Sequence, residues 1–185
     1  MANKRVARLS AGASGWSANA SGLAVDSDTD QLQLNVDGTV RKIRASRLIA
    51  AGATKTLTSV DSGSVVCLDT AAGSIVTLPA ATGTGDVFKF LVTVTATSNS
   101  HVIKVANATD EFRGYVIQDA DTATAPNTWW AADNDDTITL NRSTTGLAAQ
   151  GEYFELIDAT SGHFFVRGYS QASGTEATPF SATVS

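Results

Sequence analysis

Two glutamates in the last third of the chain are the first residues whose types and spacing could do chemistry. Glu152 and Glu155 would suit a glycosidase, in which two carboxylates flank the bond to be cleaved. The segment 152–158 is predicted as a β-strand. A three-residue spacing places the two side chains on opposite faces of a strand, which argues against a catalytic pair.

A second group of carboxylates has the spacing of a calcium-binding loop. Asp26, Asp28 and Asp30 match the first ligand positions of an EF-hand loop. The sixth position of that loop should be glycine and the twelfth glutamate, but Gln31 and Asp37 stand there. We therefore interpret this segment as an exposed acidic linker.

The remaining polar residues do not combine into a catalytic or metal-binding set. His101 and His163 each lack a second histidine or a cysteine nearby in sequence, so we expect outward-facing strand residues rather than zinc or copper ligands. The aspartates among residues 133–136 are interpreted as exposed. A nucleophile elbow, a phosphate loop and a dinucleotide fingerprint are absent from the sequence. We predict a protein that is not an enzyme, with no catalytic residues, no metal and no cofactor.

The adjacent pair Trp129 and Trp130 is the most distinctive isolated feature. It lies in a long acidic segment, residues 119–136, which is predicted as a loop. Two large aromatic side chains there could form a contact site for another protein or a platform on which a sugar stacks. The loop could equally fold back and bury both rings. The sequence leaves these three alternatives open.

The residues around these candidates are predicted to form short β-strands. In the longest apolar run, 87–95, Phe88, Phe90, Val92 and Val94 fall on one face and Lys89, Thr93 and Thr95 on the other, with Leu91 as the exception, which is the period of a half-buried strand. Gly, Pro, Ser and Asn interrupt such runs at close intervals, as they do between consecutive antiparallel strands. About ten strands with little helical periodicity predict an all-β fold, an antiparallel β-sandwich or jelly-roll-like barrel.

The chain divides into four predicted parts. Residues 1–30 form an extended N-terminal arm, 31–55 a β-hairpin and link, 56–170 the sandwich body, and 171–185 a polar C-terminal tail. The hairpin is indicated by Asp37-Gly38 between two alternating runs, because this dipeptide favours a type I′ turn. The link is expected to hold one helical turn ending at Gly52.

Charge is unevenly distributed along the sequence. Residues 1–55 hold eight Lys/Arg and four Asp, and the remainder holds five Lys/Arg and fourteen Asp/Glu, so the two parts carry +4 and −9. A basic segment on an acidic body indicates that the two parts contact different things, although a solvated tail would look the same. The formal net charge of −5 argues against general nucleic-acid binding.

The N-terminal arm is expected to bind a partner chain. It is rich in Ser, Ala, Gly and Asn without periodicity, so it would be disordered without a partner. Its candidate binding residues are Lys4, Arg5, Arg8 and Trp16, with Trp16 as an anchor. Further candidates outside the arm are Arg41, Arg44, Trp129 and Trp130.

Cysteine use and hydropathy bear on the compartment. Cys67 is the single cysteine, so no intrachain disulfide is possible and an oxidising compartment is not indicated. The basic residues at the start are not followed by the apolar stretch of a signal peptide, and no apolar run approaches the length of a membrane span. We expect synthesis in a cytoplasm and no membrane partner.

Three stretches resemble a recurrent module of tailed-bacteriophage virion proteins. They are SVDSGSVVCLDTAAGSIVTLPAATGTGDVFKF (59–90), GEYFELIDATSGHFFVRGY (151–169) and LQLNVDGTVRKI (32–43). In that module a short strand, an Ala/Gly turn and a TLP strand end lead through a Gly-rich step into a Phe-containing strand, and an E-L strand and an aromatic strand flank a tight turn at its close. The resemblance covers roughly residues 30–170 and includes no functional signature residues.

Such modules occur in capsid decoration (cement) proteins and in tail fibres or spikes. The resemblance implies a structural protein of the virion, often trimeric, and not an enzyme. A short chain without internal repeats, with a basic arm on a compact body, favours a decoration protein on the capsid exterior that binds the major capsid protein and itself as a homotrimer. The alternative is a tail-associated or receptor-binding protein that contacts host glycan.

Overall fold

The computed structural model describes residues 22–26, 31–36, 39–43, 47–119, 125–146 and 149–184. Two compact units make up the chain, residues 1–45 and 46–185. Each unit is described by itself below.

The first unit holds a three-stranded antiparallel sheet in the order β1-β2-β3. Its strands are β1 (Gly22–Asp26), β2 (Gln31–Val36) and β3 (Thr39–Ile43). Val36 pairs with Thr39, which confirms the predicted hairpin, although residues 37 and 38 themselves lie outside the described residues. The strand β1 was not predicted, since it falls within the segment interpreted as an extended arm.

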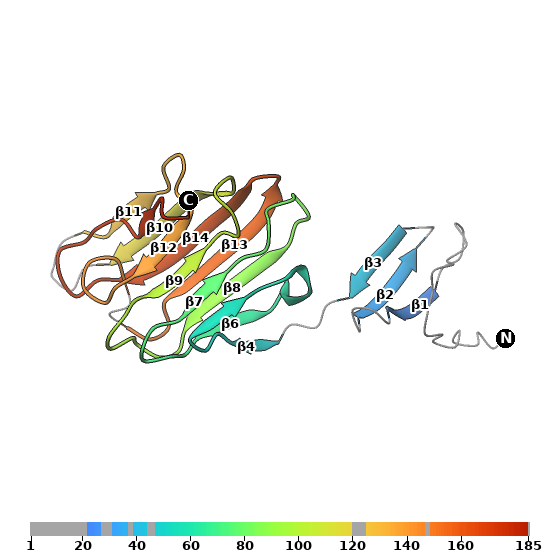
Figure 1. Cartoon of the computed structure of the whole chain (residues 1–185), viewed down its shortest axis with the longest axis horizontal. Helices are drawn as coiled ribbons and strands as arrows, with labels where there is room; N and C mark the ends of the chain where they lie inside the picture. The colour runs from blue at the N-terminus through green and yellow to red at the C-terminus, as the bar shows by residue number, and fades with distance from the viewer. Residues whose placement is uncertain are drawn as a thin grey trace. The chain divides into compact units, whose positions relative to one another are not determined.

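The second unit consists of two β-sheets, and Figure 1 labels most of their strands. The seven-stranded sheet has the order β11-β10-β14-β13-β8-β6-β4 and the five-stranded sheet the order β15-β12-β9-β7-β5. The larger sheet is built from β4 (Leu48–Ala50), β6 (Val65–Leu68), β8 (Val87–Val92), β10 (Glu111–Asp119), β11 (Asn127–Trp130), β13 (Tyr153–Thr160) and β14 (His163–Gln171). The smaller is built from β5 (Thr54–Thr56), β7 (Ile75–Thr77), β9 (His101–Lys104), β12 (Thr137–Leu140) and β15 (Phe180–Ser181). A 3-10 turn, η1 (Ser59–Asp61), follows β5.

The predicted all-β sandwich is confirmed, but the pairing within its sheets is mixed. From β4 to β9 the chain alternates between the sheets, so each strand pairs in parallel with the strand two places away: β4 with β6, β6 with β8, β5 with β7, and β7 with β9. The Gly-containing turns in this region therefore connect strands across the sandwich. Gly and Ser mark where a strand ends, but they do not determine which sheet the next strand joins, so the expectation of consecutive antiparallel pairs was wrong here.

The sandwich extends beyond the predicted boundaries at both ends. The segment 45–55, expected to be a link with a helical turn, contains β4 and β5, and Ile49 and Ala51 are buried. The segment 171–185, expected to be a polar tail, contributes β15, and Phe180 belongs to the core. In both places a few apolar residues suffice to hold a short edge strand against the sandwich.

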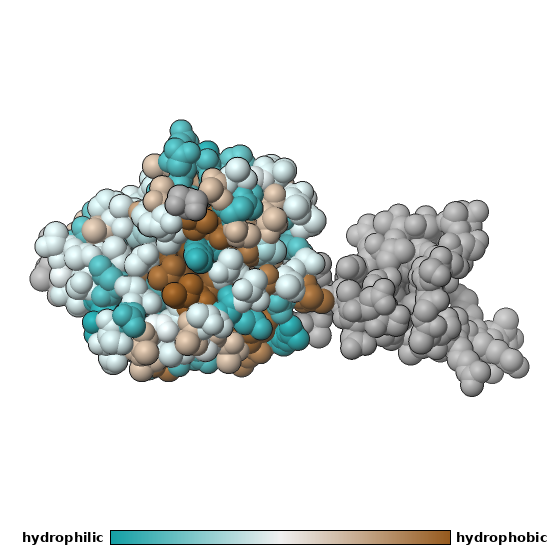
Figure 2. All heavy atoms as spheres, in the orientation of Figure 1, coloured by the Kyte–Doolittle hydropathy of each residue, from teal (hydrophilic) through white to brown (hydrophobic). Residues whose placement is uncertain are grey.

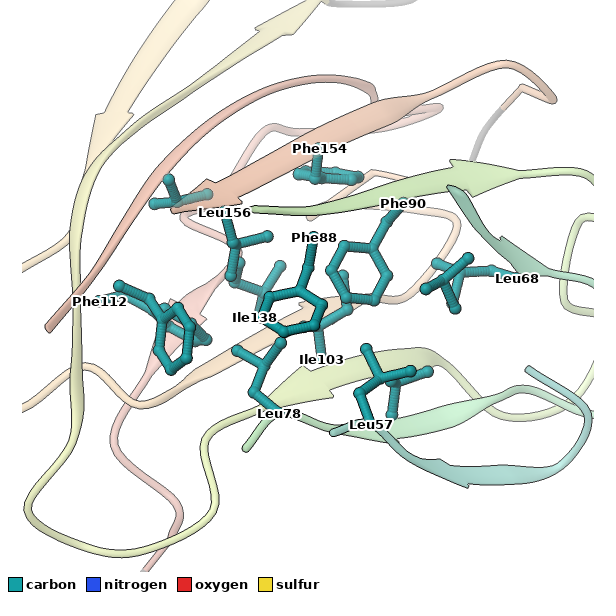
Figure 3. Packing of buried hydrophobic residues seen from close by; sticks show 14 of the residues in the cluster. Leu57, Leu68, Leu78, Phe88, Phe90, Ile103, Phe112, Ile138, Phe154 and Leu156 are labelled. Atoms are coloured by element: carbon teal, nitrogen blue, oxygen red, sulfur yellow. The ribbon is translucent and has the colours of Figure 1, made fainter. Parts of the chain in front are cut away.

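The hydrophobic core lies between the two sheets. Phe88, Phe90 and Val92 alternate inward from β8 as predicted, and all three are buried. Figure 3 shows Phe88 and Phe90 directed toward Leu78 and Ile103 across the sandwich. The ring of Phe88 meets that of Phe164 edge to face, with 6.2 Å between centroids.

Four buried carboxylates hold loops rather than perform chemistry. Asp61 accepts the backbone N–H of Thr58, and Asp110 accepts that of Ala81, both at 2.9 Å. Asp136, expected to be exposed, is buried because it accepts the N–H groups of residues 183 and 184 at 2.8 and 3.0 Å. Asp158 holds the loop before β8 in the same way. Each carboxylate accepts hydrogen bonds from backbone N–H groups that are buried in the fold. It therefore takes the place of water as their acceptor.

Candidate interaction surface

The outer face of the seven-stranded sheet carries large aromatic and apolar side chains. Alternation along its strands directs one set of residues into the core and the other outward, and an outward set is ordinarily polar. Here the outward set includes the six residues that we call the aromatic face: Tyr115, Ile117, Trp130, Tyr153, Phe165 and Tyr169. Trp130 is the most exposed of them, at 67%.

Strand register brings these residues together from four strands. Tyr115 pairs with Trp130 across β10 and β11, and their ring centroids lie 5.0 Å apart at an interplanar angle of 48°. Ile117 pairs with Tyr169 on β14, and Tyr169 pairs with Tyr153 on β13. Residues more than 50 positions apart in sequence thus form one continuous surface.

A shallow hollow of about 350 Å³ lies within the aromatic face. Its lining comprises Tyr115, Ile117, Tyr153, Glu155, Arg167, Gly168 and Tyr169. Arg167 donates to Glu155 at 2.9 Å between directly opposed positions of β14 and β13. The charged groups of the hollow therefore satisfy each other, and most of the remaining lining is aromatic or aliphatic.

Two tyrosines of the hollow are kept in the neutral form. Burial raises the pKa of Tyr153, and the neighbouring Glu155 carboxylate raises it further. Burial likewise raises the pKa of Tyr169, together with the hydrogen bond that its hydroxyl donates to Asp119 at 3.2 Å. Both side chains therefore present uncharged phenol rings at neutral pH.

A hydropathy scale does not single out aromatic side chains of this kind. On the face seen in Figure 2, strongly hydrophobic residues form small separate patches among neutral and polar ones. Tyr and Trp combine an apolar ring with a polar atom, so they rank near the middle of a hydropathy scale. Exposure and register identify the aromatic face more directly than hydropathy does.

The two adjacent tryptophans have different environments. The segment predicted as a loop contains the strand β11, so Trp129 and Trp130 face opposite sides of the sheet. Trp129 packs against the core, and its indole N–H donates to Gln118 Oε1 at 2.7 Å. Trp130 is exposed. Burial of both rings is thereby excluded, and Trp130 alone of the pair belongs to the aromatic face.

The other predicted binding residues are not brought to this surface by any described contact. Arg41 lies on β3, opposite Leu34, in the first unit. Lys4, Arg5, Arg8, Trp16 and Arg44 lie outside the described residues.

Sequence reasoning missed most of the aromatic face. A signal was present in the segment 163–171, where Phe164 and Val166 point inward, which leaves Phe165 and Tyr169 on the outward set. An aromatic residue at the outward positions of a half-buried strand is the pattern that would have identified this surface.

The residues considered for catalysis are separated or structural. Glu152 is buried and Glu155 lies on the outer face, so the prediction that they occupy opposite faces is confirmed. The prediction of an outward-facing His101 was wrong, because its buried ring bridges two segments: the Ser74 N–H donates to Nδ1, and Nε2 lies 2.9 Å from the Val94 carbonyl oxygen. Among the described residues no three His, Cys, Asp or Glu side chains gather where they could hold a metal ion.

His101 makes stability depend on pH near neutrality. Because Nδ1 accepts a hydrogen bond from Ser74, Nε2 carries the proton and donates to Val94. Protonating Nδ1 would break the first bond and bury a charge, and burial lowers the pKa of His101. The stabilisation is complete above the unfolded-state pKa of about 6.5. As the pH falls below that value toward the folded-state pKa, stability is lost at up to about 1.4 kcal/mol per pH unit.

Urea unfolding between pH 7.5 and pH 5 tests this prediction. His101→Asn should be less stable at pH 7.5 and should lose the part of the pH dependence that wild type shows below pH 6.5. His163→Gln replaces the other histidine, a partly exposed ring beside Glu111; it is the control for loss of an imidazole and should stay close to wild type in stability at pH 7.5. The assignment fails if His101→Asn retains the same slope as wild type.

Comparisons with known proteins give no further information on identity. No family model, no curated protein and no solved structure matches the chain. None of the described residues belongs to a helix long and apolar enough to cross a membrane.

Proposed function

We propose that the chain is a bacteriophage capsid decoration (cement) protein, which binds the outer surface of the assembled head and stabilises it without catalysis. The observation that carries this proposal is the aromatic face, a broad exposed surface of the kind that binds other proteins. The resemblance of residues 30–170 to virion modules and the basic charge of residues 1–55 support it. The proposed partners are the major capsid protein and further copies of the chain in a homotrimer, on the capsid exterior.

The mechanism of stabilisation is thermodynamic linkage. A protein that binds the assembled shell, and not its separated subunits, stabilises the shell by the free energy of binding. In this proposal the N-terminal arm, with Lys4, Arg5, Arg8 and Trp16, binds the major capsid protein. A trimer presents three arms, and tethering makes each contact after the first effectively intramolecular.

Deletion of residues 2–21 should abolish binding to purified heads. The deletion ends before Gly22, where β1 begins, so every described strand of both units is retained. Cosedimentation with expanded, undecorated heads measures occupancy, and the melting temperature of the heads measures stabilisation. We expect wild type to raise that temperature and the deletion variant to leave it unchanged.

A variant that replaces the cations of the arm without shortening it tests whether binding depends on the positive charge of the arm or on its length. Lys4→Gln/Arg5→Gln/Arg8→Gln should weaken binding, whereas the matched triple Lys55→Gln/Lys104→Gln/Arg142→Gln removes the same charge from the sandwich and should not. Full occupancy by the deletion variant would exclude the arm as the capsid-binding element.

A tail-associated, glycan-binding protein is the second candidate. The observation that favours it is the exposed ring of Trp130 beside the half-buried ring of Tyr115, with 5.0 Å between centroids, because a sugar can stack on such a surface. Two measurements separate the candidates. A decoration protein should be present in a virion at a copy number comparable with that of the capsid protein, and it should bind no saccharide on a glycan array. Saccharide binding that Trp130→Ala abolishes would favour the tail-associated protein.

A further inference from the structure

We infer that the aromatic face binds a second copy of the chain, with Trp130 of one copy seated in the hollow over β10, β13 and β14 of the next. This inference names the surface of self-association and rests on the self-association included in the proposed function.

The composition of the aromatic face is that of a protein interface. Tyr, Trp, Phe and Arg are enriched in interface cores, whereas unpaired charges are depleted there. The face supplies Tyr, Trp and Phe, and the hollow within it adds Arg167, which is paired with Glu155. Trp130, at 67% exposure, offers the large anchor side chain that carries binding energy at such surfaces.

The exposed area has the size of a functional surface patch. With roughly 150–250 Å² for each large side chain, the five residues that are 37–67% exposed contribute on the order of 500 Å², which lies within the range of the largest apolar patch of a monomer, a patch that is often functional. A standard interface buries about 800 Å² on each partner. The aromatic face would fill the core of such an interface, and the apolar surface continues through Leu91 on β8, which pairs with Tyr153.

Charge on this surface permits contact with an identical copy. Lys89 on β8 pairs with Glu155, which pairs in turn with Arg167, and Asp119 borders the surface at Tyr169. Around the hollow two cationic and two anionic side chains thus balance, and beside Phe165 the charge of Arg113 is paired with Glu111 and Asp133, although the whole chain has a net charge of −5. A neutral surface on an acidic protein does not repel its own copy and does not select a strongly charged partner.

The surface carries both an exposed ring and a recess. Trp130 lies on β11, the edge strand of the sheet, and is 67% exposed, and the hollow lies over the strands next to it. Each copy therefore has both a large exposed ring and a recess of about 350 Å³ in which such a ring could sit. A head-to-tail contact of this kind can close into a ring of three, and a two-fold contact would close a pair.

The polar groups of the hollow fit a sugar less well than a protein. A saccharide is held by side chains that direct free donors and acceptors at its hydroxyls, and unpaired polar groups would supply them. Here Arg167 and Glu155 are bonded to each other, and the Tyr169 hydroxyl is bonded to Asp119. These bonds occupy part of the donor and acceptor capacity of the hollow, and an apolar side chain can enter without needing further polar partners.

The test measures the mass of the full chain in solution as a function of concentration, by analytical ultracentrifugation and light scattering. Trp130→Ala should raise the dissociation constant of the wild-type oligomer about 30-fold or more, which corresponds to loss of a strong interface contact. Ile75→Ala is the matched control, because Ile75 is exposed to 42% on β7 of the other sheet, and it should leave the mass unchanged. Circular dichroism verifies that both variants are folded.

The outcomes distinguish this inference from the proposed function. The inference is supported if Trp130→Ala dissociates the oligomer and Ile75→Ala does not. A wild-type mass of two copies would support the aromatic face as the surface of self-association but would exclude a trimer. An oligomer unchanged by Trp130→Ala overturns the inference and leaves self-association intact. A wild-type monomer at all concentrations overturns both, and saccharide binding by that monomer, lost in Trp130→Ala, assigns the face to glycan.

Discussion

Gly114→Ala is expected to lower the free energy of unfolding by about 3–5 kcal/mol, as the sum of a strained backbone conformation and an overpacked contact. Gly114 has φ +117°, which side-chain-bearing residues rarely adopt. A Cβ at this position would lie 2.1 Å from the Val166 carbonyl oxygen of β14. Since that oxygen belongs to backbone in the parallel pair of β10 and β14, it can move only if the pair separates.

The consequence reaches the aromatic face. Tyr115 and Ile117 on β10, together with Trp130 on β11, are joined to Phe165 and Tyr169 through this strand pair. Loosening the pair separates the two halves of the face, so the variant should also lose self-association at concentrations where it is still folded.

Urea unfolding and sedimentation of the same samples measure the two effects. Gly174→Ala is the matched control, because a Cβ there would meet nothing closer than the Ser143 carbonyl oxygen at 3.4 Å and its φ is not positive. Its stability should stay within about 0.5 kcal/mol of wild type. If Gly114→Ala proved as stable as Gly174→Ala, β10 would have to accommodate a side chain by a shift that the pairing does not suggest.

Alternation within single strands was predictable from sequence, and pairing between strands was not. The inward set Phe88, Phe90 and Val92 follows from a local period of two that no distant residue can change. Whether β6 joins the sheet of β5 or that of β4 depends on packing across the whole sandwich. The turn around Gly63 is compatible with either connection, so the mixed sheets could not be derived from the turn residues.

The candidate site was predictable only where a conspicuous local residue pair marks it. The Trp pair marks residues 129 and 130, but the acidic residues and Pro126 around it predict a loop. The observed strand β11 is held by pairing with β10, a contact that no local pattern reveals. Tyr115 and Tyr169 were missed for the same reason, because they become one surface only through strand register.

The burial of a polar side chain could not be predicted where it depends on a hydrogen bond to a distant backbone group. His101 lies in an alternating run and was expected to face solvent. Its two ring nitrogens instead satisfy backbone groups of Ser74 and Val94, and this exchange makes burial of an imidazole possible. A sequence does not show which backbone groups lack a partner, so buried residues of this kind cannot be recognised before the fold is known.

Asp158→Asn is expected to lower the free energy of unfolding by roughly 2–4 kcal/mol, since charged acceptors make the stronger hydrogen bonds in proteins. The carboxylate of Asp158 accepts three backbone N–H groups of one loop, from Thr82 at 3.1 Å, Gly83 at 2.7 Å and Thr84 at 3.3 Å. The loop leads into β8, which supplies Phe88 and Phe90 to the core. An amide keeps one oxygen but turns an NH₂ group toward donors, so part of the loop loses its acceptor.

The pH dependence of this difference identifies the carboxylate as its cause. Burial acts to raise the pKa of Asp158, but the backbone hydrogen bonds from Gly83, Thr82 and Thr84 outweigh it and hold the pKa below its ordinary value. The stabilisation is therefore fully present above the unfolded-state pKa of about 4 and is lost as the pH falls through the folded-state pKa. The difference in the free energy of unfolding between wild type and Asp158→Asn should be constant from pH 7 to pH 5. It should become smaller below about pH 4.

A matched substitution on the surface separates this effect from general loss of charge. Asp133→Asn removes the same charge from a side chain that is 90% exposed and 3.2 Å from Arg113. An exposed ion pair of this kind contributes about 0–1 kcal/mol, so urea unfolding at pH 7 should show little change. If Asp133→Asn and Asp158→Asn destabilised equally, net charge would be the cause. A gap for Asp158→Asn that persisted unchanged at pH 3 would mean that the shape of the side chain, and not its charge, holds the loop against β8.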